Sequence, residues 1–134
     1  MPRQSKYNKE EKDNVKSYQY KAAIYIRLSV EDGDKEESNS ITNQRMLLNQ
    51  FLKDNSDIEV YDYYTDDGFS GTTFNRPGFE KLLEDLYEKK FNTVIVKDLS
   101  RLGRNYIEVG NYIEKVFPLY NIRFIAVNDQ IDSI

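Results

Sequence analysis

Short β-rich runs alternate along this chain with segments of helical periodicity, and this alternation limits the possible folds more than any other feature. Apolar and β-branched residues predict strands over 21–28, 58–65, 92–97 and 122–127. Apolar residues at helical spacing predict helices over 41–52, 77–86 and 104–117, the last ended by Pro118. Helical connections of this length join parallel strands. We therefore expect an α/β fold with an open, mainly parallel sheet of four to five strands and helices on both faces.

Charge divides the chain into two parts. The first 21 residues carry six basic and three acidic groups, whereas the rest of the chain carries 13 basic and 20 acidic groups. Residues 1–20 lack an apolar period, so we expect a flexible polar arm there and one folded domain over 21–134. The 113 residues that follow residue 21 have a net charge of −7, and a domain this acidic does not attract nucleic acid by its overall field. A polyanion must therefore be held by a local cluster of cations or by parts outside this chain.

Composition excludes several kinds of chemistry. The chain contains no Cys and no His, which removes disulfides, thiolate nucleophiles, imidazole bases and zinc sites built on these residues. No stretch approaches the roughly 20 consecutive apolar residues of a membrane helix, and the first twenty residues lack the apolar centre of a signal peptide. We expect a cytoplasmic protein without membrane contact, whose chemistry uses hydroxyls, carboxylates, amines or guanidinium groups.

The first predicted strand ends in polar residues, at the edge of the sheet where ligands bind in open α/β folds. Alternation places Arg27 and Ser29 on the same face as Ala23 and Tyr25. An arginine and a hydroxyl are therefore expected together at this rim. They either meet a ligand or form an ordinary strand end that emerges into solvent.

Two arginines, Arg101 and Arg104, follow the third predicted strand and would share one face of a helix that began there. The helix dipole disfavours cations at its N-terminus, so an anionic ligand would resolve the conflict. Guanidinium groups match pairs of phosphate oxygens, which makes a phosphate the expected anion. The alternative is that Asp98 or Glu108 neutralises these arginines.

Polar groups near the other strands reach the same edge. Gln44 and Arg45 lie in the first predicted helix, and Ser70 lies in the loop after the second strand. Four of the seven arginines map to this edge, around the hydroxyl of Ser29: Arg27, Arg76, Arg101 and Arg104. The convergence indicates an anion site more strongly than any one segment does.

Together these segments resemble the catalytic domain of the serine site-specific recombinases, the resolvase and invertase family. The resemblance runs from about residue 22 to residue 132 and keeps the order and spacing of the motifs. The form KDLSRLGRN is most similar to the large serine recombinases of mobile elements. The motifs that carry it are Tyr25-x-Arg27-x-Ser29, Gln44, Thr65-Asp66, Ser70-Gly71, Arg76-Pro77-Gly78 and the segment 99–104.

The resemblance implies a function and a role for each matching residue. The chain would be the catalytic domain of a DNA recombinase that cleaves and rejoins DNA and moves a mobile element. Ser29 would attack the scissile phosphate, forming a 5′-phosphoserine link and freeing a 3′-hydroxyl. The other catalytic residues would be Arg27, Arg101, Arg104 and Gln44, and those that contact the substrate would be Tyr25, Asp66, Ser70, Arg76 and Ser100. No cofactor and no metal are implied.

One position departs from the family pattern. Many small resolvases have Asp directly before the first arginine of the Arg-x-x-Arg motif, where this chain has Ser100. The group that assists proton transfer to the leaving oxygen is therefore left open between Asp66 and a guanidinium. The resemblance also implies DNA as partner, a homodimer and a synaptic tetramer of the full-length protein. The chain is expected to stop before the dimerisation helix and the DNA-binding domains.

Two other functions, a signalling domain and a nuclease, are also compatible with the sequence at this point. A receiver-like signalling domain has a similar sheet and would hold Mg²⁺ on Glu31, Asp32 and Asp98. A metal-dependent nuclease would use the carboxylates Asp66, Asp67 and Asp98. Neither explains the arginine cluster, and a requirement for Mg²⁺ would distinguish both from a recombinase.

Overall fold

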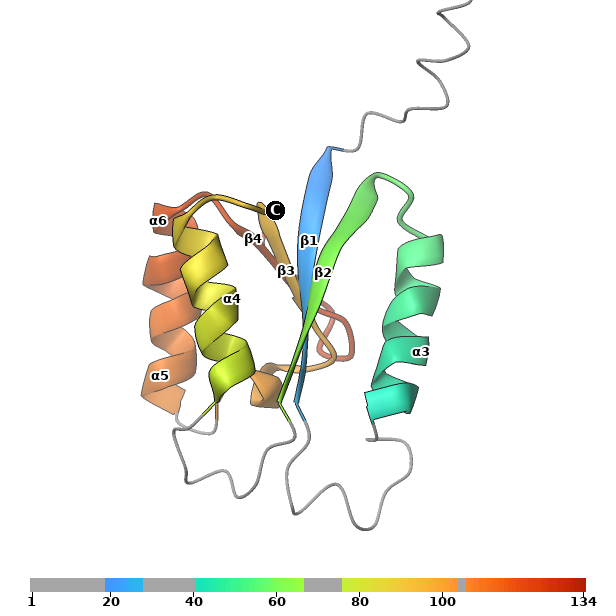
Figure 1. Ribbon diagram of the computed structural model, residues 1–134, viewed down its shortest axis with the longest axis horizontal. Coiled ribbons are helices and arrows are strands. Elements are labelled where there is room, and N and C mark those ends of the chain that lie inside the picture. Colours follow the sequence, from blue (N-terminus) through green and yellow to red (C-terminus); the bar gives the residue numbers. More distant parts are fainter. Residues whose placement is uncertain (1–18, 28–40, 67–75, 104–105) are drawn as a thin grey trace, which may run out of the picture.

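A five-stranded sheet forms the centre of the fold (Figure 1). The computed structural model describes residues 19–27, 41–66, 76–103 and 106–134. The strands lie in the order β2-β1-β3-β4-β5. Their bounds are β1 (Tyr20–Arg27), β2 (Ile58–Asp66), β3 (Thr93–Val96), β4 (Arg123–Ala126) and β5 (Ile131–Asp132). The first four strands are parallel and β5 returns antiparallel to β4, so the predicted, mainly parallel sheet is confirmed.

Helices cover both faces of the sheet, as the alternation predicts (Figure 1). On one face lies α3 (Ile41–Lys53), and on the other lie α4 (Pro77–Tyr87) and the helical run between β3 and β4. The run consists of α5 (Tyr106–Asn111), the π-helical turn η3 (Tyr112–Val116) and α6 (Phe117–Leu119). No helix in the described part of the chain is long and apolar enough to cross a membrane.

The helical run passes Pro118, where the sequence analysis predicted that it would end. The N–H of Phe117 bonds to the carbonyl of Tyr112, five residues earlier, and α6 continues to Leu119. A π turn is wider than an α turn, which gives the proline ring more room beside the preceding carbonyls. The helix therefore gains one more turn before β4.

A bulge in β2 sets the direction of the residues at its carboxyl end. The pairing with β1 shifts by one residue after Val60, which leaves Tyr61 as the extra residue. Ile58 packs in the core under α3, whereas Tyr64 packs in the core under α4. Strict alternation from Ile58 would turn Asp66 toward α3, but the bulge turns it toward α4 instead.

The core consists of two clusters, one on each face of the sheet, and β1 contributes to both. Ala23 and Tyr25 lie in the cluster under α4, while Ala22, Ile24 and Ile26 lie in the cluster under α3. All five side chains are fully buried. The predicted division of this strand into two faces is confirmed.

A buried carboxylate joins α4 to β2. Asp85 is 4% exposed, and the Tyr64 hydroxyl donates to its Oδ2 at 2.7 Å. The Nζ atoms of Lys81 and Lys90 lie 3.3 and 3.6 Å from its Oδ1. Burial by itself raises the pKa of Asp85, but the hydroxyl and the two ammonium groups outweigh it, so the pKa lies below its ordinary value.

We expect Asp85→Asn to weaken the acid dependence of stability. A carboxyl whose pKa is lowered by folding stabilises the protein above its ordinary pKa, and this stabilisation is lost as the pH falls through the folded-state pKa. The variant should be about 1 kcal/mol less stable at pH 7. Between pH 7 and pH 3, urea unfolding should show a smaller loss of stability in the variant than in the wild type.

The exposed carboxylate of Glu84 on the same helix provides the control. Glu84→Gln should keep the acid dependence of the wild type. An Asp85→Asn curve parallel to the wild-type curve would show that Asp85 does not cause this dependence.

Candidate active site

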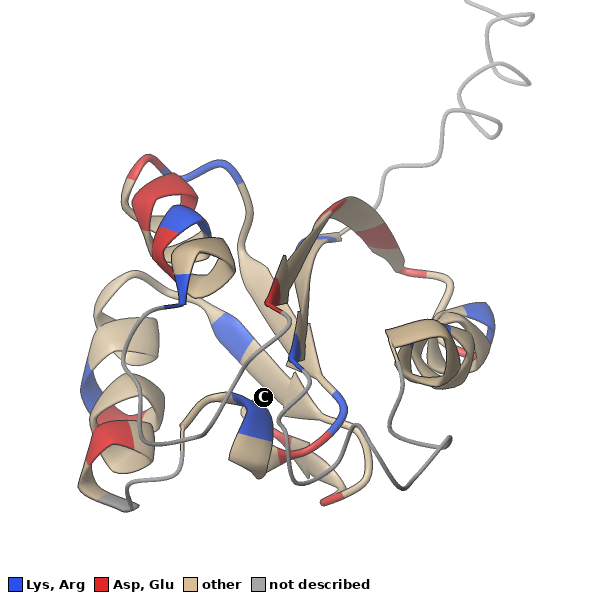
Figure 2. Ribbon diagram, turned by 60° about the horizontal axis from the view of Figure 1, so that its bottom comes forward, with Lys and Arg blue, Asp and Glu red and all other residues tan. Residues whose placement is uncertain are grey.

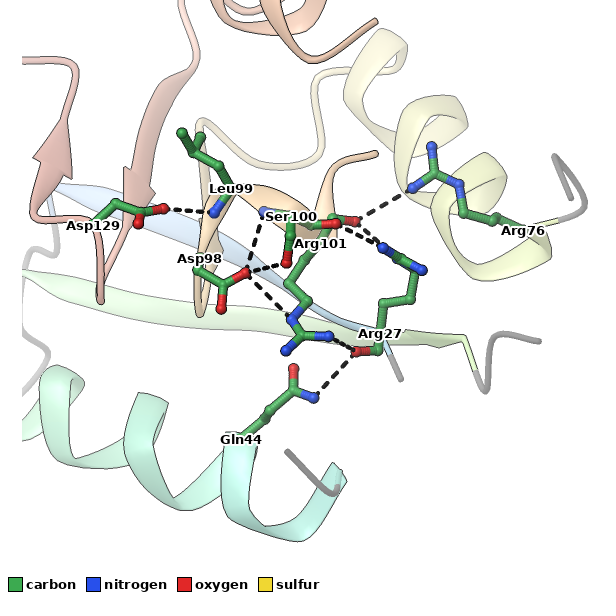
Figure 3. A network of polar contacts seen from close by, with 8 residues as sticks. All are labelled: Arg27, Gln44, Arg76, Asp98, Leu99, Ser100, Arg101 and Asp129. Carbon is green, nitrogen blue, oxygen red and sulfur yellow. Dashed lines mark hydrogen bonds and ion pairs between the residues drawn. The ribbon is translucent and has the colours of Figure 1, made fainter. Parts of the chain in front are cut away.

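Two buried arginines meet at the carboxyl end of β1 (Figure 3). Arg27 is the last residue of β1, and Arg101 is the last residue of η2 (Leu99–Arg101), a 3-10 turn that follows β3. Arg101 Nη1 donates to the carbonyl of Arg27 at 2.9 Å, and Arg27 Nε donates to the carbonyl of Arg101 at 3.3 Å. Each guanidinium is therefore held by the backbone of the other residue.

Burial of these two cations requires close acceptors, because a charged group that leaves water without partners is strongly destabilising. Arg27 is 5% exposed and Arg101 is 3% exposed. Arg27 Nη2 also donates to the carbonyl of Ser100 at 2.6 Å, and Asp98 Oδ1 lies 3.5 Å from Arg101 Nε. The carbonyls and one carboxylate compensate for the burial and leave a positively charged cluster at the edge of the sheet.

Two aspartates hold the η2 turn in place. The Asp98 carboxylate accepts hydrogen bonds from the Ser100 amide at 3.2 Å and from the Ser100 hydroxyl at 2.5 Å. Asp129, in the connection between β4 and β5, accepts from the Leu99 amide at 2.7 Å. These bonds fix the direction of the turn's carbonyls, which in turn accept from the arginines (Figure 3).

The η2 turn removes the conflict with the helix dipole that the sequence analysis predicted for Arg101. Arg101 does not begin a helix, since η2 is a single turn capped by Asp98 and α5 begins at Tyr106. The alternative, in which Asp98 approaches Arg101, is observed. Glu108 approaches Arg76 at 3.3 Å.

Gln44 reaches the same cluster from the opposite face of the sheet. Its side chain is fully buried in α3, and Nε2 donates to the carbonyl of Arg27 at 3.1 Å. This carbonyl therefore accepts from both Gln44 and Arg101. The two bonds fix the backbone two residues before Ser29, which itself lies outside the described residues.

Arg76 joins the cluster from the residue before α4. Its Nη1 donates to the carbonyls of Leu102 at 2.8 Å and Arg101 at 3.3 Å. Its guanidinium also lies over the ring of Phe79, 4.4 Å from the centroid. The structure thus brings Arg27, Arg76 and Arg101 together around one turn.

Asp66 and Tyr25 lie beside this cluster and connect β1, β2 and α4. Asp66 accepts from the amides of Gly78 at 2.7 Å and Phe79 at 3.0 Å, and from the Tyr25 hydroxyl at 2.7 Å. Burial and the neighbouring carboxylate raise the pKa of Tyr25, which keeps its hydroxyl protonated as a donor. A Cβ on Gly78 would lie 2.6 Å from the carbonyl of Thr65, so glycine permits this close approach. Asp66 therefore supplies the N-terminal cap of α4.

We expect Asp66→Ala to destabilise the protein by about 3 kcal/mol, because two buried donors and one partly buried donor lose their acceptor. Tyr25→Phe removes only one donor and should cost about 1 kcal/mol. Urea unfolding measures both differences. Asp62→Ala on the same strand, where the carboxylate is exposed, should change stability by less than about 0.5 kcal/mol. If Asp66→Ala matched this control, Asp66 would not be the cap of α4.

Several predicted residues lie outside the described part of the chain. They are Ser29, Ser70 and Arg104 of the recombinase-like site, and Glu31, Asp32 and Asp67 of the two metal-dependent alternatives. Among the described residues, no group of three or more acidic side chains is arranged to hold a metal ion.

The sequence analysis missed the contact that Asp129 makes. Asp129 lies 30 residues from Leu99, and no local pattern indicates that the two meet. The cap formed by Asp98 could have been predicted from the sequence, because an Asp side chain commonly accepts from the amide two residues later.

Comparison with known proteins identifies similar domains. The family described as resolvase, N-terminal domain, matches residues 22–133. The N-terminal catalytic domain of TP901-1 integrase is 35% identical with a TM-score of 0.72, covering 84% of this chain and 81% of that one. A resolvase family site-specific recombinase from Streptococcus pneumoniae is 28% identical with a TM-score of 0.68, covering 86% and 76%. The C-terminal catalytic domain of ISC1926 TnpA, an IS607-like serine recombinase, is 25% identical with a TM-score of 0.64, covering 80% and 69%.

Proposed function

Because this chain belongs to the resolvase N-terminal domain family of serine recombinases, we propose that Ser29 attacks a DNA phosphodiester and forms a 5′-phosphoserine link. The family cleaves and rejoins DNA in the recombination of mobile elements. The observation that carries the proposal is the cluster of Arg27, Arg76 and Arg101 at the end of β1, the strand that leads into Ser29. Membership in the family also decides against a receiver-like domain and a metal-dependent nuclease.

The proposed reaction transfers a DNA phosphoryl group to Ser29 and keeps the energy of the phosphodiester bond in the new ester. The Ser29 hydroxyl gives up its proton as its oxygen forms a bond to phosphorus, the bond from phosphorus to the 3′-oxygen breaks, and the leaving oxygen takes up a proton, so that no proton is gained or lost overall. Attack by a 3′-hydroxyl on the phosphoserine reverses the step and rejoins the strand. Because one phosphate ester replaces another, ATP is not required, and the proposed reaction uses guanidinium groups in place of a metal to stabilise the charge on the phosphate.

Clustered guanidinium groups suit this reaction. Phosphoryl transfer depends mainly on positioning and on stabilisation of the charge that develops on the phosphate oxygens. Arg27 and Arg101 are already held by fixed backbone carbonyls, so little reorganisation is needed when the phosphate arrives. Asp66 accepts three hydrogen bonds in its capping role, which supports a guanidinium over Asp66 as the group that assists the leaving oxygen.

We further propose that the DNA-binding surface and the contacts for a homodimer and a synaptic tetramer come from segments of the full-length protein outside residues 1–134. Residues 22–134 carry a net charge of −7. In the described part of the chain, both basic and acidic positions occur along the helices (Figure 2). A region with this net charge does not attract DNA by its overall field, which supports phosphate contacts supplied from elsewhere. The reaction would take place in the cytoplasm of a bacterial host.

A nicked suicide substrate tests the function. It carries the recombination site with a nick that lets the released fragment diffuse away, so that the cleaved intermediate accumulates. The full-length protein should form a covalent adduct with DNA, and digestion should recover the phosphate on the peptide that contains Ser29. EDTA should leave the yield unchanged. Cleavage without an adduct, or cleavage that requires Mg²⁺, would support a nuclease instead.

A further inference from the structure

We propose that Glu108 is a positioning residue for the recombination reaction, because it sets the direction in which Arg76 faces the DNA phosphate. This inference rests on the proposed function of the site and assigns a role to a residue of α5 that the sequence analysis treated only as a neutralising charge. Its Oε2 lies 3.3 Å from Arg76 Nη2. The Arg76 side chain is 13% exposed and that of Glu108 is 28% exposed, so water screens the pair only in part.

The contacts of Arg76 hold one side of its guanidinium and leave another side available. Nη1 donates to the carbonyls of Leu102 and Arg101, and one N–H of Nη2 donates to Glu108. Within the described part of the chain, no acceptor pairs with Nε–H or with the second N–H of Nη2. A guanidinium presents Nε–H and a neighbouring N–H as a fork that matches two phosphate oxygens. Glu108 and a phosphate can therefore bind Arg76 together.

A glycine provides the space for the Glu108 carboxylate. A Cβ on Gly103 would lie 2.5 Å from Glu108 Oε1, closer than two such atoms can approach. The backbone of Gly103 has no positive φ, so the lack of a side chain matters here for space and not for conformation. The carboxylate therefore sits against the end of the arginine-bearing turn because residue 103 is glycine.

These contacts fix the plane of the Arg76 guanidinium from three directions. The two carbonyls accept from Nη1, the Phe79 ring lies against the face of the guanidinium, and Glu108 accepts from Nη2. If the Glu108 carboxylate is removed, Nη2 loses its acceptor. The guanidinium can then rotate about the hydrogen bonds that Nη1 makes to the two carbonyls. A guanidinium that samples several orientations stabilises the transition state less often, although its charge is unchanged.

A double-mutant cycle between positions 76 and 108 tests the inference. In the full-length protein, Glu108→Gln should lower the single-turnover cleavage rate about tenfold while DNA affinity changes less than about twofold. In an Arg76→Ala background, the same substitution should change the cleavage rate less than about twofold, since there is no guanidinium left to orient. Gly103→Ala, which displaces the carboxylate but keeps its charge, should reproduce the loss seen with Glu108→Gln.

Two control variants lie on the same helical run. Glu114→Gln removes an exposed negative charge, and Gly110→Ala adds a Cβ where no atom lies within 4 Å. Both should cleave at the wild-type rate. A purely structural role of Glu108 would lower the unfolding midpoint and reduce cleavage equally in the Arg76 and Arg76→Ala backgrounds, which would overturn the inference.

Faster cleavage by Glu108→Gln would also overturn it, because the carboxylate would then compete with the phosphate for Arg76. Failure of the proposed function is distinguishable from these outcomes. It would appear as an adduct that persists without the Ser29 hydroxyl, whatever the result at position 108.

Discussion

Ser29→Ala is expected to abolish the covalent adduct and to lower DNA cleavage by at least about 10⁴-fold, because the variant lacks the attacking oxygen. The chain contains no Cys and no His that could replace it as a nucleophile. Gln44 and Arg101 both donate hydrogen bonds to the carbonyl of Arg27, and the substitution removes neither bond. The fold and the affinity for DNA should therefore be retained.

Denaturing gels of suicide-substrate reactions measure the adduct, and urea unfolding checks the fold. Ser56→Ala, which removes an exposed hydroxyl at the turn before β2, is the matched control and should form the adduct at the wild-type rate. If Ser29→Ala also formed it at that rate, the nucleophile would have to be another hydroxyl, and the proposed mechanism would be wrong.

Arg101→Ala is expected to lower the cleavage rate by about 10²–10³-fold, the effect of losing one fixed donor to a developing negative charge. DNA affinity should fall much less, because contacts to the phosphate strengthen mainly in the transition state. Arg101→Lys should recover little of the rate. A lysine keeps the charge, but it cannot bond to the Arg27 carbonyl and to the phosphate with the same planar group.

Single-turnover cleavage and equilibrium DNA binding, measured on the same variants, separate these effects. Arg45→Ala is the matched control. The sequence analysis expected Arg45 at the same edge of the sheet, but the structure places it over the Tyr63 ring, exposed on α3. It should leave the cleavage rate unchanged. Equal losses of rate and affinity in Arg101→Ala would identify Arg101 as a simple phosphate anchor. By resemblance, Arg104→Ala should behave as Arg101→Ala does.

Local patterns predicted much of the fold because burial acts on them directly. The alternation in β1 predicted its two faces, since successive side chains of a strand point to opposite sides. Pro77 and the apolar spacing from Phe79 to Leu86 predicted α4, which begins at Pro77 and buries both of these apolar residues. These features depend on residues within a few positions of one another.

The role of Asp66 shows where local patterns fail. The sequence predicted Asp66 directly after the second strand, whereas the structure makes it the last residue of β2. Its direction depends on the bulge at Tyr61, which shifts the strand by one residue. A bulge is set by how two strands pair and not by the residues of one strand alone. Asp66 therefore caps α4, and its three partners include a hydroxyl 41 residues away.

The sequence by itself determined the fold class and placed Arg27, Arg76 and Arg101 at the carboxyl edge of the sheet, because periodicity and the order of strands are set by neighbouring residues. The tertiary structure alone decided which atoms those arginines contact. Arg27 and Arg101 lie 74 residues apart and hold each other's backbone, and Asp129 supports their turn from 30 residues beyond Leu99. Such bonds form only after the sheet and its helices have packed, since packing is what brings these distant donors and acceptors within reach.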